Sequence, residues 1–106
     1  MRVERPLVLE IDRREPRVGK EITVRVRDRS NRPVEDAIVE AGSKRVRTDH
    51  RGRCTLTLRT PGFWKILATK PPTGRVAYEP ATALIRVVPG RAASRSGRRI
   101  NRGLSG

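Results

Sequence analysis

The chain has 106 residues, which is enough for one small domain with a modest hydrophobic core. Its formal net charge of +14, from 25 basic and 11 acidic residues, favours contact with anionic surfaces. Cys54 is the single cysteine, which excludes an intrachain disulfide. No stretch approaches the roughly 20 apolar residues of a membrane span, and no secretory signal is visible after Met1. The localisation stays unknown: virion or cytoplasm for a complete chain, cell surface for a fragment.

Alternating apolar and polar residues predict about seven short strands. The first carries Leu7, Leu9 and Ile11 on one face, and the second spans 21–27, with Ile22, Val24 and Val26 alternating with polar residues. Strands near 37–41, 45–48, 53–59, 63–68 and 83–87 follow. The residues predicted to point inward along them are Ala37, Val39, Ala41, Val46, Cys54, Leu56, Leu58, Trp64, Ile66, Ala68, Ala83, Ile85 and Val87.

Turn formers separate these strands. Asp49, His50, Arg51 and Gly52 predict a hairpin turn, in which Asp accepts backbone hydrogen bonds and Gly adopts a positive φ. No stretch has uninterrupted helical periodicity. The sequence therefore predicts an all-β chain, with one immunoglobulin-like or transthyretin-like β-sandwich over 1–90. Residues 91–106, rich in Arg, Ser and Gly, are predicted to form a disordered basic tail of charge +5.

Three segments carry a resemblance to known domain families. The first is Gly19, Ile22-x-Val24-x-Val26-x-Asp28 and then Pro33-Val34-x-x-Ala37-x-Val39. The second is Thr48-Asp49-x-x-Gly52-x-Cys54-x-Leu56, and the third is Pro61-Gly62-x-Trp64-x-Ile66-x-Ala68. This order resembles carboxypeptidase regulatory-like, Cna protein B-type and bacterial Ig-like domains. The resemblance implies a transthyretin-like sandwich that acts as a spacer, stalk or binding module.

The sequence offers little for catalysis. His50 is the only histidine and lies at a predicted hairpin tip, while Cys54 is expected in the core rather than as a nucleophile. Neither has a partner at metal-ligand spacing. Asp28 with Glu35 and Asp36 could bind Ca²⁺, although acids in such loops usually solvate turns. The chain is therefore predicted not to be an enzyme and to need no cofactor.

Basic residues predicted to point outward from the strands form one candidate site. Guanidinium groups bind phosphate and carboxylate through paired hydrogen bonds, so such a face and the tail could bind nucleic acid or another polyanion. The alternative is a solvated sheet face on which acids pair with the arginines. The candidate anion contacts are Arg25, Arg27, Arg53, Arg59, Lys65, Arg86, Arg91, Arg95, Arg98, Arg99 and Arg102.

Three apolar residues are predicted to point outward from the sandwich. Phe63, Leu67 and Leu84 would form a patch if their strands are neighbours, and such patches mark contacts. The first hypothesis is therefore a non-catalytic structural or accessory module that acts by protein–protein contact or self-assembly, within a virion or a cell-surface array. The alternative is an accessory protein that binds nucleic acid or another polyanion. A carbohydrate-binding module is disfavoured because exposed aromatics are scarce.

Overall fold

The computed structural model describes residues 3–90 and contains no helix in that range. The strands are β1 (Val3–Pro6), β2 (Val8–Ile11), β3 (Glu21–Arg27), β4 (Ile38–Ala41), β5 (Lys44–Arg47), β6 (Arg53–Thr57), β7 (Gly62–Thr69), β8 (Val76–Glu79) and β9 (Ala81–Val87). One sheet has the order β2-β3-β6 and another the order β5-β4-β7-β9, while β1 and β8 form a separate parallel pair. The predicted all-β sandwich is confirmed, and residues 91–106 lie outside the described range.

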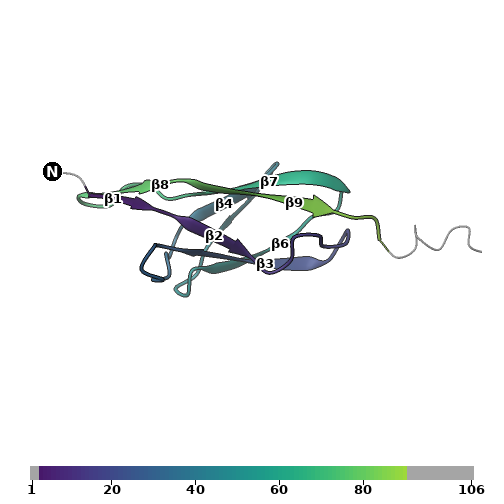
Figure 1. The fold of residues 1–106 in the computed structure, drawn as a ribbon, viewed down its shortest axis with the longest axis horizontal. Coiled ribbons are helices and arrows are strands. Elements are labelled where there is room, and N and C mark those ends of the chain that lie inside the picture. The colour runs from purple at the N-terminus through teal and green to yellow at the C-terminus, as the bar shows by residue number, and fades with distance from the viewer. Residues whose placement is uncertain (1–2, 91–106) are drawn as a thin grey trace, which may run out of the picture.

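The core lies between the two larger sheets, and period-two alternation builds it. Ile22, Val24 and Val26 of β3 are fully buried, and Ile66 and Ala68 of β7 face them from the other layer. Cys54 on β6 is buried, as expected. Each layer therefore contributes one apolar face to the core and leaves a polar or mixed face outside. Figure 1 shows the two layers, with β7 and β9 in one and β3 and β6 in the other.

The N-terminal segment changes sheets. β1 pairs with β8 in parallel, and the Leu7 N–H donates to the Glu79 carbonyl at 3.0 Å. The chain then crosses to the other layer, where β2 pairs antiparallel with β3 (Figure 1). The single first strand predicted within 2–11 is therefore two strands around buried Leu7, and β8 is an additional one. β2 and β9 belong to different sheets and are not paired with each other, and a cavity lies between them.

Trp64 packs against the core, as its predicted inward direction requires, but its side chain is only half-buried. In the described residues, Ile22, Leu58 and Ile66 are the largest fully buried side chains. Its indole lies over Gly42, where a Cβ would come within 2.7 Å of the ring, and its N–H donates to the Thr60 carbonyl at 2.8 Å. Trp64 therefore covers one end of the sandwich beside two loops, and the largest fully buried side chains of the described core are all aliphatic.

Candidate interaction surface

The outer face of the four-stranded sheet brings the three outward apolar residues together. β7 and β9 pair with Lys65 opposite Leu84, Phe63 opposite Arg86 and Leu67 opposite Thr82. Leu84 is therefore the diagonal neighbour of both Phe63 and Leu67, within reach of long side chains. Phe63 is 73% exposed and Leu84 60% exposed, whereas Leu67 is half-buried. The three residues expected to form a patch thus lie on one face of two paired strands; we call Phe63, Leu67 and Leu84 the apolar patch.

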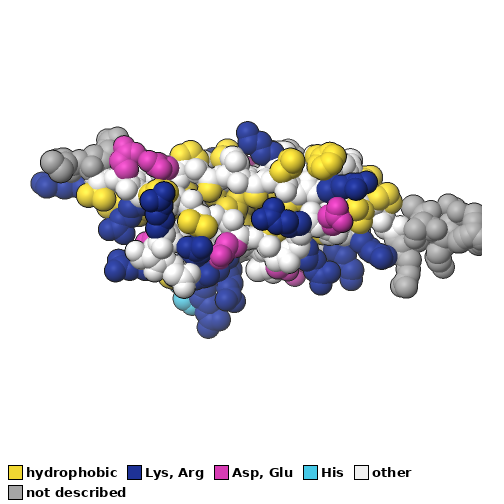
Figure 2. Space-filling model, in the orientation of Figure 1, with side chains coloured by type: hydrophobic (Ala, Val, Ile, Leu, Met, Phe, Trp, Pro, Cys, Tyr) yellow, Lys and Arg dark blue, Asp and Glu magenta, His cyan; other side chains and the backbone are white. Residues whose placement is uncertain are grey.

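Basic side chains surround the apolar patch. Lys65 and Arg86 lie between its members on β7 and β9, and Arg45 and Arg47 lie on β5 at the far edge of the same sheet. Glu40 is the one acid on the strands of this face, and its carboxylate lies 3.7 Å from Arg45; the Glu15 carboxylate, from the loop after β2, lies 4.0 Å from Arg86. Figure 2 shows hydrophobic and basic side chains intermixed over β7 and β9. The face therefore combines exposed apolar area with an excess of positive charge.

Ile38 belongs to the same face and was not assigned to it from the sequence. It lies opposite Thr69 of β7 and Arg47 of β5, and it is half-buried. The signal was present, because inward Ala37 and Val39 place the residue between them on the outer side.

The candidate anion contacts divide between different surfaces. Arg25, Arg27 and Arg53 lie on the outer face of the three-stranded sheet, while Lys65 and Arg86 lie on the opposite side of the sandwich. Arg59 follows β6 in a loop, with Nη1 3.9 Å from the position a Cβ on Gly19 would take. These residues therefore do not form one continuous arginine face. The remaining candidates, Arg91, Arg95, Arg98, Arg99 and Arg102, lie outside the described residues.

Acidic partners neutralise part of the three-stranded face. Glu10 bridges two arginines, with one carboxylate oxygen 3.2 Å from Arg25 Nη1 and the other 3.3 Å from Arg27 Nε. Arg53 lies directly opposite Arg25 and, within residues 3–90, has no acid within ion-pair distance. Glu21 adds a further negative charge to this face. The face is therefore close to balanced in charge and lacks exposed aromatic rings.

The other polar residues of interest serve the fold. Asp28 is buried, and its Oδ1 accepts hydrogen bonds from the N–H groups of Ser30 at 2.8 Å and Arg32 at 2.9 Å. Asp49 accepts from the N–H groups of Arg53 at 3.0 Å and Arg51 at 2.8 Å, which holds the pKa of its carboxyl below the ordinary value. Burial, with a smaller contribution from the Asp49 charge, raises the pKa of the Cys54 thiol to about 11.

These carboxylates are therefore engaged in their own loops, and the Cys54 thiol is held protonated. Within the described residues, no three His, Cys, Asp or Glu side chains cluster as a metal site. The same part of the chain has no helix that could cross a membrane. His50 is exposed at the tip of the turn that follows Asp49.

Comparison with known proteins gives no match to a family model, to a curated protein or to a solved structure. The resemblance to carboxypeptidase regulatory-like and related Ig-like domains therefore stays a prediction from the sequence. The all-β sandwich itself stands on the strand order and register described above.

Proposed function

We propose that this protein is a non-catalytic β-sandwich module that binds another protein through the outer face of its four-stranded sheet. The observation that carries the proposal is the apolar patch, with Phe63 73% and Leu84 60% exposed on neighbouring strands. Exposed apolar residues gathered on neighbouring strands and rimmed by polar ones are typical of protein contact surfaces. Aromatic and aliphatic anchors supply most of the affinity of such contacts.

The charge around the patch favours an acidic partner over a second copy of the chain. Lys65 and Arg86 lie among the apolar residues, and two copies that met through this face would bring like charges together. The formal net charge of +14 adds repulsion at longer range. A partner with carboxylates around an apolar centre would pair with the same basic groups, which then set orientation and encounter rate.

Polyanion binding is the second candidate function. Two features support it: the Arg53 guanidinium has no acid within ion-pair distance in residues 3–90, and residues 91–106 carry a charge of +5. The balanced charge and missing aromatic platform of the three-stranded face weigh against it, because single-stranded nucleic acid binds through base stacking as well as charge.

Paired variants of the full chain distinguish these two functions. Phe63→Ser with Leu84→Ser removes the apolar anchors without adding charge, and Val3→Ser is a matched control, since Val3 is a 50% exposed apolar residue on β1. Immobilised wild-type protein would be incubated with extract of the source cells or particles, and retained proteins identified by mass spectrometry. Specific partners should be retained by wild type and Val3→Ser and lost from the double variant.

A duplex DNA fragment tests the polyanion alternative in the same format. Arg53→Gln and a deletion of residues 91–106 should weaken any DNA binding and reduce its salt dependence, because each phosphate contact releases counterions. If all retained partners depend on these arginines and none on Phe63 and Leu84, protein contact through the apolar patch is refuted and polyanion binding takes its place.

A further inference from the structure

β9 presents a short unpaired backbone edge. The Arg86 N–H donates to the Arg14 carbonyl at 3.0 Å and the Val88 N–H to the Pro16 carbonyl at 2.9 Å, so these groups point away from β7. Because alternate residues of a strand direct their backbone groups to the same side, Thr82 and Leu84 also point away from β7. In the described chain, neither residue pairs with backbone outside the strand ladders.

The edge is bounded at both ends. The Leu7 bond to Glu79 closes one end, and the connection through Arg14 and Pro16 closes the other. Between them, the N-terminal segment has left for the other sheet, where β2 pairs with β3. The open edge therefore offers the N–H and C=O groups of Thr82 and Leu84, which suits a short extended segment and excludes a long strand.

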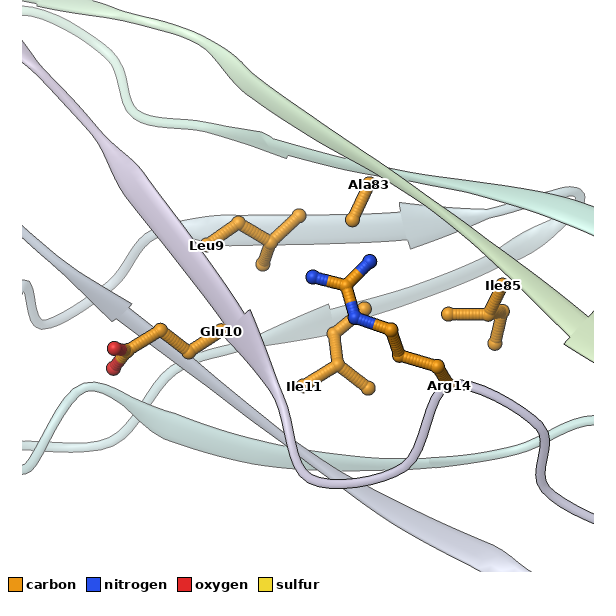
Figure 3. A pocket seen from close by; sticks show the side chains of 6 residues that line it. All are labelled: Leu9, Glu10, Ile11, Arg14, Ala83 and Ile85. Atoms are coloured by element: carbon orange, nitrogen blue, oxygen red, sulfur yellow. The ribbon is translucent and has the colours of Figure 1, made fainter.

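A cavity of about 270 Å³ lies beside this edge, between the two layers. Leu9 and Ile11 of β2 and Ala83 and Ile85 of β9 form its apolar walls, and the Arg14 side chain extends among them (Figure 3). Its volume is below the roughly 300–1,000 Å³ of sites for small organic ligands, so it fits a single side chain better. The inward-pointing residue of an added segment would lie over this cavity.

The Arg14 guanidinium is available to a ligand. Within residues 3–90 it has no acid within ion-pair distance. Glu10 also lines the cavity, but its carboxylate points away and binds Arg25 and Arg27 (Figure 3). A guanidinium held among apolar side chains can bind a carboxylate through two parallel hydrogen bonds. The cavity therefore selects an acidic group next to an apolar one.

We propose that the β9 edge and the Arg14 cavity bind an extended acidic peptide segment of a partner protein. Thr82 and Leu84 form backbone hydrogen bonds with the segment, one apolar side chain enters the cavity, and an Asp or Glu side chain pairs with Arg14. Strand addition of this kind takes affinity from the backbone bonds and specificity from side-chain pockets. A second copy is disfavoured by the +14 charge, and residues 91–106 contain no acidic residue to meet Arg14.

Selection of displayed short random peptides against the full chain tests this site. Enriched peptides should alternate apolar and polar residues and carry Asp or Glu. Thr82→Pro removes one outward N–H and leaves the ladder to β7 intact, because proline is tolerated at a strand edge. Thr82→Pro and Arg14→Glu should each weaken a selected peptide about tenfold or more. Phe63→Ser, on β7, is the matched control and should keep the affinity, since β9 separates Phe63 from the added segment.

The remaining outcomes contradict the proposal. Peptides without acidic residues, no enrichment over the Thr82→Pro protein, or binding unchanged by both variants would each overturn it. A wild-type dimer in sedimentation that Thr82→Pro abolishes would assign the edge to a second copy instead. The peptide test does not depend on the side chains of Phe63 and Leu84, so its failure would not affect the proposal for the apolar patch. In the same way, failure of the apolar-patch proposal would not affect the proposal for the β9 edge.

Discussion

Gly52 is the position at which a single methyl group should damage the fold most clearly. It lies at the end of the Asp49 turn with φ of 74°, and its carbonyl accepts the Val26 N–H at 2.7 Å. A Cβ there would collide with the Val26 backbone oxygen and come within 3.1 Å of the Val34 backbone nitrogen. Neither atom can move without disturbing hydrogen bonds, because the Val34 N–H itself donates to the Val26 carbonyl at 3.0 Å.

The expected loss for Gly52→Ala combines two terms. A left-handed backbone costs a residue with a Cβ about 1–2 kcal/mol. Overpacking of a filled site adds about 1–3 kcal/mol. The sum, about 2–5 kcal/mol, is a large part of the roughly 5–15 kcal/mol by which a small domain is stable.

Gly74→Ala is the matched control, since Gly74 has φ of 56° and no atom within 4 Å of a Cβ. It should lose only the conformational term. Urea and thermal unfolding, followed by circular dichroism, measure both variants, and each kcal/mol should lower the melting temperature by about 4–8 °C. Equal losses for the two variants would show that the contact with Val26 is not rigid, and the steric reasoning would be refuted.

Two further predictions concern the pH dependence of stability that arises from Cys54 and from Asp49 in the Gly52 turn. The Cys54 pKa of about 11 lies above the unfolded value of 9.0, so its contribution to the free energy of unfolding should be fully present below pH 9 and decrease as pH rises toward 11. Cys54→Ala should remove this decrease. Alkylation of the thiol should be much slower in the native protein than in urea. The Asp49 pKa lies below the unfolded value of 3.8, so its contribution should be present above that pH and lost as pH falls through the folded pKa. Asp49→Ala should lower the melting temperature at pH 7 and reduce its dependence on acid, and an unchanged acid profile would contradict this role.

The in-or-out direction of side chains was predictable from the sequence, because it depends on local alternation. Ile22, Val24 and Val26 are buried, and Phe63 and Leu84 are exposed, as period two requires. The sequence also marked the turn at Gly52, where the positive φ suits glycine.

The pairing of strands was not predictable, because alternation within one strand does not say which sheet the strand joins. Arg53 and Lys65 are both outward, yet they lie on opposite sides of the sandwich. For the same reason the sequence could not predict the Arg14 cavity, because its walls come from β2 and β9, which are far apart in the chain. Alternation placed Trp64 on the inward side correctly, but it could not show that Trp64 lies at the end of the core and stays half-buried.

The two proposed surfaces meet at Leu84. Its side chain belongs to the apolar patch, while its N–H and C=O lie on the open edge of β9. Both can hold for one residue because side-chain direction and backbone hydrogen-bond direction each alternate every second residue along a strand. A segment added to β9 would extend the four-stranded sheet and place its own outward side chains beside Leu84. If one partner covers both surfaces, Phe63→Ser and Thr82→Pro should weaken it non-additively in a double-mutant cycle, because loss of one anchor loosens the other. Additive losses would instead mean that the patch and the edge contribute independently to binding, and a partner sensitive to only one of the two variants would use that surface alone.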